Sequence, residues 1–444
     1  MRGAGEGADL HPARPSTFAC DVLVVGGGPS GAAAAYWLAE AGLKVLVVEK
    51  KHFPRDKTCG DLLSSRSVRQ LYDMGLHDEF VDRHRFDGVR AFAFGREVLV
   101  PWPTHPKYPA YGYVITRAEL DDLVSSRAEK SGAVLWQGAE AVEPLGDMSD
   151  HGGPALGARV LDHDHGTTTE VRASYVIVAD GSNSRFGRAL GAARDRARPQ
   201  AMAIRGYYYS PRHAEPTVEF HLDIRDPEEG NVLPGYGWIF PTGDGRVNVG
   251  VGLVSSSQGR KAVNTSRLLD SFVAHAPKSW CLGPETMCAP ATGGRLPMGL
   301  SVGPRVGPDY LLVGDASGSV NPMNGEGIAY GYETGRLAAA HVAEALATHD
   351  PFVLGEYEPA LQDCYGQYFR VASCFAQLIE RPKVMQRLFA TGMHSKWAMG
   401  CLVRIMSNLM RPDETGAAEL AYRAAAAAVT RWPGCSSGMP DMPA

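Results

Sequence analysis

The chain of 444 residues lacks several features that mark particular classes of protein. Neither sign of charge dominates: 44 Lys and Arg stand against 49 Asp and Glu, and the net charge of −5 argues against nucleic acid as a partner. No apolar run is long enough to span a bilayer. Residues 1–20 lack the apolar core of a secretory signal, so we expect a cytoplasmic protein with a disordered tail over residues 1–19.

The eight Cys residues are scattered and include no CxxC pair. We therefore expect neither a metal site nor a disulfide framework, which fits a reducing compartment. In contrast, the chain contains 51 Gly, and hydrophobic residues make up 44% of it. This composition allows two or three closely packed domains with a large core.

The N-terminal part of the chain predicts a β-α-β unit. Asp21–Val25 is typical of a buried strand, an Ala-rich helix extends to about Ala41, and Lys44–Val48 is typical of the next strand. Between the first strand and the helix, the glycines have the GxGxxG spacing of a tight turn that approaches a pyrophosphate. The residues expected to contact a dinucleotide here are Gly26, Gly28, Pro29, Ser30, Gly31, Glu49 and Lys50.

The acid at the end of the second predicted strand favours a turn that binds a dinucleotide over an incidental Gly-rich turn. Glu49 follows Gly31 by 18 residues. Its carboxylate can accept two charge-assisted hydrogen bonds from the hydroxyls of a ribose. The same charge would repel a 2′-phosphate, so NADP is not expected at this site.

A second segment has the same pattern of a strand followed by glycine. Tyr175–Ala179 predicts a buried strand that ends in Asp180 and Gly181, and Arg185 follows within charge reach of a diphosphate. A lone Asp-Gly turn would mean little. Its place between two other segments of nucleotide-binding type favours a contact with the cofactor.

The third segment, Gly314–Ile328, carries the strongest signal. It follows Tyr310–Val313, a predicted buried strand, and precedes a helical pattern that begins near Ala329. Backbone N–H groups and the dipole at such a helix start favour negative charge, which a reduced flavin ring carries. The alternative is a Gly-rich loop without a ligand. The residues expected around the flavin half of the cofactor are Gly314, Asp315, Pro322, Gly325, Gly327 and Ile328.

The order of these segments predicts an α/β fold with a Rossmann-type FAD-binding domain that is discontinuous in sequence. Alternating runs between Ala201 and Val254 predict an inserted antiparallel sheet for the substrate, and helical periodicity dominates from Ala329 to Thr430. The expected domains are 20–90, 110–195 and 290–345 for FAD, 91–109 and 196–289 for the substrate sheet, 346–430 for a helical part, and 431–444 for a disordered tail.

Together these segments resemble the flavoprotein superfamily that includes aromatic hydroxylases, halogenases and geranylgeranyl reductases. Two more segments narrow the resemblance to the geranylgeranyl reductase family. Phe53–Asp61 is similar to its PRxKxCGD segment, and Pro234–Pro241 is similar to its YxWxFP segment. The resemblance extends from about Asp21 to Met410 and is closest to actinobacterial menaquinone and prenyl-chain reductases.

The resemblance implies noncovalent FAD beneath a long apolar channel. It implies that Cys59 and Gly60 lie beside the flavin, that Tyr236 and Trp238 face the reacting carbon chain, and that Arg117 packs near the FAD. One position departs from the family pattern, which has CGDG followed by Thr-Pro. Here Leu62 replaces the second glycine and the Thr-Pro is absent. Because glycine permits close approach and positive φ, this change bears on the substrate and on the reaction.

The resemblance also implies reduction of an isolated C=C bond in a prenyl or other long apolar chain. Such a bond accepts a hydride only when a positioned acid protonates the other carbon in a dry pocket. Cys59 is a candidate donor or a lining group, and Tyr236 and Trp238 either shape the channel or pack the sheet. The alternative function is a flavin-dependent monooxygenase or epoxidase acting on an apolar secondary metabolite. A non-enzymatic flavin-binding subunit is a third interpretation.

Two expectations concern partners. The sequence shows no second nucleotide motif, so electrons are expected from an external donor, either NAD(P)H or a separate reductase or ferredoxin. Residues Val384–Met410 mix Leu, Phe, Met and Trp with Arg and Lys. Such an amphipathic segment either caps the substrate domain, which we favour, or lies peripherally on the inner face of a membrane.

Overall fold

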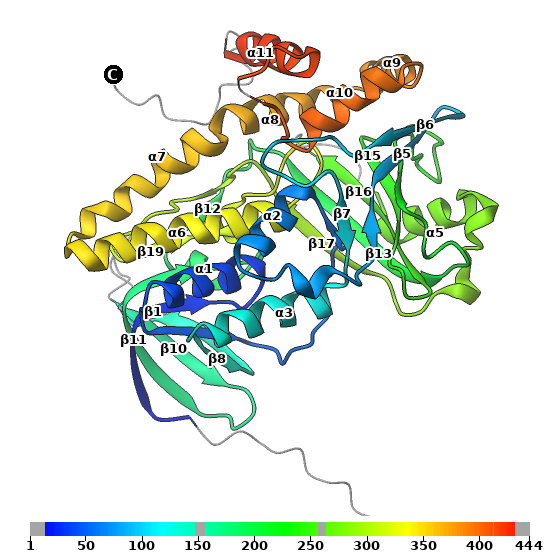
Figure 1. The fold of residues 1–444 in the computed structure, drawn as a ribbon. Coiled ribbons are helices and arrows are strands. Elements are labelled where there is room, and N and C mark those ends of the chain that lie inside the picture. Colours follow the sequence, from blue (N-terminus) through cyan, green and yellow to red (C-terminus); the bar gives the residue numbers. More distant parts are fainter. Residues whose placement is uncertain (1–13, 147–155, 256–262, 412, 431–444) are drawn as a thin grey trace, which may run out of the picture.

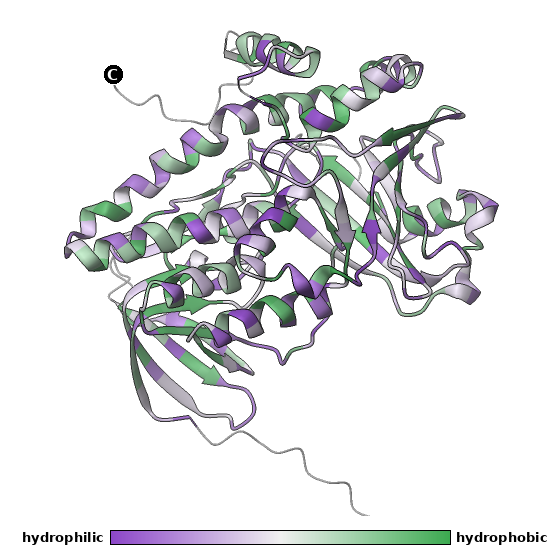
Figure 2. Cartoon of the chain, in the orientation of Figure 1, coloured by the Kyte–Doolittle hydropathy of each residue, from purple (hydrophilic) through white to green (hydrophobic). Residues whose placement is uncertain are grey.

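A computed structural model describes residues 14–146, 156–255, 263–411 and 413–430. Two seven-stranded sheets form the two ends of the molecule, and the last helices lie across the top of the second sheet (Figure 1). Hydrophobic residues concentrate on the strands of the first sheet, whereas the outer face of helix α3, Arg117–Lys130, is mostly hydrophilic (Figure 2).

The first sheet has the order β8-β2-β1-β11-β10-β9, with β19 also paired to β11. Its strands are β1 Thr17–Val25, β2 Val45–Glu49, β8 Val134–Gln137, β9 Ala139–Pro144, β10 Gly157–Asp162, β11 Thr168–Val178 and β19 Tyr310–Leu312. Strands β8, β2, β1, β11 and β19 are parallel, and β9 and β10 continue the sheet as an antiparallel ribbon. The parallel strands end at one edge, where ligands of doubly wound sheets bind.

Helices cover the first sheet because small residues let them approach closely. The helices of the chain are α1 Pro29–Glu40, α2 Ser65–Asp73, α3 Arg117–Lys130, α4 Arg185–Ala189, α5 Thr265–His275, α6 Ile328–Thr348, α7 Tyr357–Leu361, α8 Gln367–Ile379, α9 Pro382–Gly392, α10 Lys396–Met406 and α11 Ala417–Thr430. The four consecutive alanines Ala32–Ala35 of α1 are buried. A Cβ on Gly335 of α6 would lie 2.3 Å from the carbonyl oxygen of Ser30, so only glycine allows this contact between α6 and α1.

The second sheet has the order β17-β13-β16-β15-β14-β5-β6. Its strands are β5 Gly88–Ala93, β6 Arg96–Pro101, β13 Gln200–Tyr209, β14 Thr217–His221, β15 Gly235–Pro241, β16 Arg246–Ser255 and β17 Thr292–Pro297. The expected antiparallel sheet needs one correction: β14 and β5 run parallel, because they come from separate segments and not from a hairpin. Two smaller sheets contain β3 Leu62–Leu63, β4 Arg85–Phe86 and β7 Gly112–Val114, and β12 Ala193–Arg194 with β18 Val302–Gly303.

Some expected boundaries were wrong. Residues 88–90 and 292–297 were expected in the FAD-binding domain, but they belong to the second sheet, where β17 pairs with β13. Residues 17–19 were expected in the N-terminal tail, but they extend β1, because Thr17 pairs with Glu170 of β11. Residues 14–16 of the expected tail are also described, and Arg14 pairs with Asp162 at 2.9 Å. Residues 1–13 and 431–444 lie outside the described residues.

The segment expected as one amphipathic helix, Val384–Met410, forms most of two helices, α9 and α10. Their apolar side chains pack against β5 and β6, in a cluster that joins Met385, Phe389 and Met399 to Val98 and Val100. The expected capping of the second sheet is therefore confirmed. In the described ranges, no helix combines the length and the hydrophobicity needed to cross a membrane.

Candidate active site

A cavity of about 900 Å³ is lined by both large sheets and by the C-terminal helices. This is at the upper end of the usual size of small-molecule sites, roughly 300–1,000 Å³. Of the residues predicted from the sequence, those that line it are Gly26, Gly28, Pro29, Ser30, Glu49, Lys50, Cys59, Gly60, Arg117, Asp180, Gly181, Tyr236, Trp238, Gly314, Asp315, Pro322, Gly325, Gly327 and Ile328. Gly31 stands behind this wall, where a Cβ would lie 1.9 Å from the carbonyl oxygen of Gly26.

The first part of the cavity wall is the turn between β1 and α1. Gly26 has a φ of +104°, and a Cβ there would lie 2.5 Å from the carbonyl oxygen of Ala179. At Gly28, which precedes α1, the nearest atoms to such a Cβ are guanidinium nitrogens of Arg55 and Arg117, 3.8 and 4.0 Å away. The turn therefore presents open backbone and positive charge at a helix N-terminus, which suits a diphosphate.

Buried ion pairs hold these arginines in place. Arg117 donates from Nε and Nη2 to the two carboxylate oxygens of Asp121, both at 2.7 Å. Arg55 bridges Asp121 and Glu49, with N–O distances of 2.9 and 3.1 Å. Glu49 also accepts a hydrogen bond from the backbone N–H of Gly27 at 3.1 Å. The predicted ribose ligand is thus fixed beside the turn that would hold the diphosphate.

The carboxyl ends of β11 and β19 supply the second part of the wall. Asp180 has one buried oxygen, Oδ1, without a hydrogen-bond partner among the described residues, and a Cβ on Gly181 would meet no atom within 4 Å. Gly314 has a φ of +58° and packs against Ser30 of α1. Burial raises the pKa of Asp315, which lines the cavity near the start of α6. Polar groups and free space at these ends fit a long phosphate-bearing cofactor such as FAD.

The loop that carries Cys59 is bonded to the second sheet. The buried carboxylate of Asp61 accepts hydrogen bonds from the hydroxyl of Tyr207 and, at 2.8 Å, from Nδ2 of Asn248. The same Nδ2 also donates to the carbonyl oxygen of Cys59 at 2.9 Å, and Oδ1 of Asn248 accepts from Nε1 of Trp238 at 2.9 Å. These hydrogen bonds join the loop that carries Cys59 and Asp61 to strands β13, β15 and β16 of the second sheet.

Burial changes the acidity of two side chains in this loop, Asp61 and Cys59. Burial raises the pKa of Asp61 to about 6, and the hydrogen bonds from Tyr207 and Asn248 partly offset this rise. It also raises the pKa of the Cys59 thiol, so this sulfur keeps its proton at neutral pH. Sequence analysis did not connect Tyr207 or Asn248 with Cys59, because neither lies near Cys59 in the sequence.

The leucine that departs from the family pattern carries no backbone strain. Leu62 lies in β3 and pairs with Val114 of β7. The positive φ of this turn, +63°, belongs to the preceding residue, Asp61. Only the side chain of Leu62 therefore distinguishes it from glycine, and that side chain lines the cavity.

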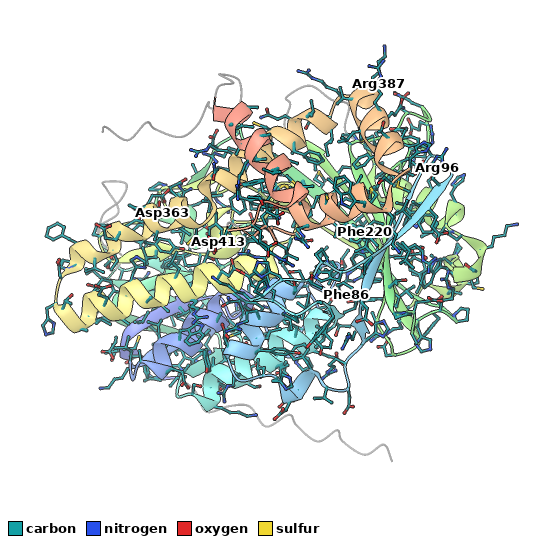
Figure 3. The ribbon with its side chains drawn as sticks, turned by 45° about the horizontal axis from the view of Figure 1, so that its top comes forward. Phe86, Arg96, Phe220, Asp363, Arg387 and Asp413 are labelled. Carbon is teal, nitrogen blue, oxygen red and sulfur yellow. The ribbon has the colours of Figure 1, made fainter. Side chains whose placement is uncertain are left out.

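Beyond the loops that carry Cys59 and Gly325, the cavity continues as an apolar arm. We use this name for the part lined by Ala91, Phe220, Leu222, Tyr236 and Phe240 of the sheet and by Phe375, Ile379, Phe389, Met399, Leu402 and Val403 of helices α8 to α10. Phe220 lies on the sheet, below these helices (Figure 3). Its ring packs edge to face on Tyr236 and Phe240, at centroid distances of 5.4 and 5.1 Å.

Among the acids of this cavity, sequence analysis did not name Glu326. Glu326 precedes α6 and lines the cavity, and its Oε1 accepts a hydrogen bond from the hydroxyl of Ser64. Its other oxygen, Oε2, is buried without a hydrogen-bond partner among the described residues. Burial raises the pKa of Glu326 to about 7. In the sequence, Glu326 stands between Gly325 and Gly327, but sequence analysis expected this segment to act through its backbone alone.

Comparisons with known proteins agree with this geometry. A family model described as "FAD binding domain" matches residues 19–261. The chain is 41% identical to a menaquinone reductase of Mycolicibacterium smegmatis over 93% of this chain and 97% of that protein. It is 30% identical to a digeranylgeranylglycerophospholipid reductase of Thermoplasma acidophilum over 77% of this chain and 83% of that protein.

Solved structures show the same fold. A geranylgeranyl bacteriochlorophyll reductase-like protein from Thermoplasma acidophilum superposes with a TM-score of 0.70 at 25% identity, over 92% of this chain and 96% of that one. The flavin-dependent brominase Bmp2 superposes with a TM-score of 0.69 at 18% identity, over 93% and 99% of the two chains, and shows the fold alone. The motifs, the cavity and these relatives show that the chain is an FAD-dependent oxidoreductase of the geranylgeranyl reductase family.

Proposed function

We propose that this protein uses FAD to reduce a C=C bond in the prenyl chain of a lipid, with an isoprenoid quinone as the first candidate. The observation that carries the proposal is that the flavin-facing loops and the apolar arm belong to one cavity. Two kinds of relatives are named for reducing menaquinone and digeranylgeranylglycerophospholipid. These lipids share a polyprenyl chain and differ in their head groups, so a common reaction is expected on the chain.

FAD would lie along the edge of the first sheet. In this arrangement Glu49 and Lys50 hold the ribose, and Gly26, Gly28, Pro29 and Ser30 lie against the diphosphate. Asp180, Gly181, Gly314 and Asp315 follow the cofactor towards its ring. Pro322, Gly325, Gly327 and Ile328 face the ring at the start of α6. Arg117 supports the diphosphate through its position beside Gly28.

The chain's own residues would hold the substrate and supply the proton. Reduced FAD supplies a hydride to one carbon of the double bond. Cys59, Tyr236 and Trp238 are proposed to contact the reacting part of the chain. For the proton on the other carbon we propose Glu326: its pKa of about 7 makes it an acid suited to neutral pH, whereas burial makes the Cys59 thiol a weaker acid than usual.

Two further points belong to this proposal. The electrons are expected from an external donor, NAD(P)H or a reductase or ferredoxin, because the sequence contains no second nucleotide motif. The protein is expected in the cytoplasm, in peripheral contact with the membrane in which such lipids reside. The apolar arm supports this second point, because a prenyl chain that enters it must leave a bilayer.

The test is an anaerobic incubation of the FAD-loaded protein with a chemical reductant and a prenyl quinone. After reoxidation in air, a product heavier by two hydrogens shows chain reduction, because a merely reduced quinone ring returns to its starting mass. Fragment masses locate the change in the chain. A quinone with a fully saturated chain is the control and should gain no mass. Turnover that occurs only with oxygen and adds an oxygen atom would establish the monooxygenase alternative instead.

A further inference from the structure

The last helices of the protein differ in charge from the rest of the chain. Residues 381–411 contain six Lys and Arg and no Asp or Glu. Because the whole chain has a net charge of −5, the residues outside this stretch sum to −11. A strongly cationic segment in an otherwise acidic protein makes the two sides of the molecule electrostatically different.

Four of these cations are not used inside the protein. Arg381, Lys383, Arg387 and Lys396 are exposed and form no ion pair with any residue that the structure describes. The remaining two, Arg404 and Arg411, pair with Glu419 and Glu414 at 3.3 and 2.7 Å. Arg387 extends from α9 into solvent, at the same end of the molecule as Arg96 (Figure 3).

Apolar side chains accompany the four cations on the outside of the same two helices. Trp397 is 68% exposed and Leu388 is 39% exposed. Trp is favoured at the interface between membrane and water, where its ring meets both apolar and polar groups. We call Arg381, Lys383, Arg387, Lys396, Leu388 and Trp397 the basic face.

The inner sides of these helices close the apolar arm. Phe389 of α9 and Met399, Leu402 and Val403 of α10 line the cavity, on the opposite side from the basic face. Only one layer of helices therefore separates the apolar arm from whatever contacts the basic face. A prenyl lipid that reaches the apolar arm from a bilayer at the basic face would have to cross only this layer.

We propose that the basic face docks on the surface of a membrane that contains anionic lipids. The proposal rests on the proposed function for its choice of a lipid partner. The pattern of unpaired cations around an exposed Trp is that of an interfacial amphipathic helix. The negative charge elsewhere on the chain would be repelled from the same surface, so the protein is oriented with α9 and α10 against the bilayer.

The test is the cosedimentation of the FAD-loaded protein with vesicles of phosphatidylcholine alone or with 30% phosphatidylglycerol, and it needs no turnover. We expect binding to the anionic vesicles that weakens as salt is added. The triple variant K383Q/R387Q/K396Q should lower the partition coefficient at least tenfold, since each cation near an anionic surface contributes about a fivefold factor. Trp397→Ala should lower it on both kinds of vesicle.

Matched variants separate the basic face from net charge and general hydrophobicity. K44Q/K130Q/K278Q removes three exposed cations elsewhere, and Phe352→Ala removes an aromatic side chain that is 85% exposed. Both should bind as the unmodified protein does. Equal loss in the two triple variants, or binding that does not depend on anionic lipid, would overturn the proposal. So would a dimer that dissociates in Trp397→Ala. Vesicle binding without chain reduction would instead reject the proposed function alone.

Discussion

The hydroxyl of Ser64 donates a hydrogen bond to Oε1 of Glu326, which lies 262 residues later in the chain. Ser64 belongs to the stretch that departs from the family pattern after Cys59, and Glu326 belongs to the Gly-rich loop before α6. The segment that departs from the family pattern is therefore hydrogen-bonded directly to the Gly-rich loop before α6. Beside it, Arg66 pairs with Glu333 of α6 at 2.6 Å, and burial raises the pKa of Glu326 although the charge of Arg66 acts to lower it.

The first prediction concerns the acid itself. Because Glu326 must be protonated to donate a proton to the substrate, turnover should fall as pH rises through about 7. Glu326→Gln should abolish this limb of the pH profile and lower turnover at least a hundredfold. The pKa of Glu326 is raised in the folded state, so between about pH 4.5 and 7 the folded protein keeps a proton on Glu326 that the unfolded chain has lost. The unmodified protein should lose stability relative to Glu326→Gln as pH rises from about 4.5 to about 7. Rate profiles and thermal unfolding against pH measure the two effects.

Ser64→Ala is the matched control for that variant. The hydrogen bond from Ser64 lowers the pKa of Glu326 against the effect of burial. Removing it should move the pH limb of turnover to higher pH while the acid remains. An unchanged limb in Ser64→Ala together with a retained limb in Glu326→Gln would assign the titration to another group.

The second prediction concerns the ribose ligand. Glu49→Gln keeps the size of the side chain but removes its charge, so FAD affinity should fall about 10- to 100-fold, the equivalent of the roughly 1.5–3 kcal/mol of a charge-assisted hydrogen bond. Fluorescence quenching of added FAD measures the affinity. Glu143→Gln, an exposed acid on β9, is the control and should bind FAD normally. Unaltered affinity in Glu49→Gln would place the ribose elsewhere.

The third prediction concerns position 62. Leu62→Gly restores the family residue, but the positive φ of the turn lies at Asp61, so no backbone strain is relieved. The variant should lose about 1–3 kcal/mol of unfolding free energy through the lost packing. It should also change which double bond of a long chain is reduced, because space opens in the cavity wall. Chemical denaturation and product fragment masses report these changes, and identical products would show that Leu62 does not touch the substrate.

The fourth prediction concerns the length of the apolar arm. Leu402→Trp places a larger ring in the wall formed by α10. The KM for long prenyl chains should rise about tenfold, while short-chain analogues react as before. The visible spectrum of bound FAD checks that the cofactor site is intact. Equal effects on long and short chains would indicate a general disturbance and not a shortened arm.

Local pattern was sufficient to predict much of this molecule. The first β-α-β unit and the strands at Tyr175 and Tyr310 follow from apolar runs that end in glycine or an acid, and their ends meet because parallel strands share one edge. Four strands of the second sheet follow from alternation. Strands β13 to β16 correspond to the alternating runs that were expected between Ala201 and Val254. These features depend only on residues close in sequence.

What sequence analysis missed depends on residues that are distant in the chain. The contact of Asp61 with Tyr207 and Asn248 requires the register of β13 against β16, which no local pattern contains. The parallel pairing of β5 with β14 joins segments that are separated in the sequence by strands β8 to β11 of the first sheet. The raised pKa of Glu326 is a consequence of its burial in the cavity, and the hydrogen bond that partly offsets this rise comes from Ser64, which is distant in the sequence.

The discontinuity of the first sheet has a consequence for how the protein acquires its cofactor. The ends of β1, β11 and β19 and the start of α6 all face the same cavity, so the part of its wall that is expected to hold FAD is incomplete until Ile328 has left the ribosome. A nascent chain can form the N-terminal β-α-β unit early, but it has no partner for the flavin ring at that stage. A chain truncated before α6 would therefore lack the part of the wall that is expected to face the flavin ring.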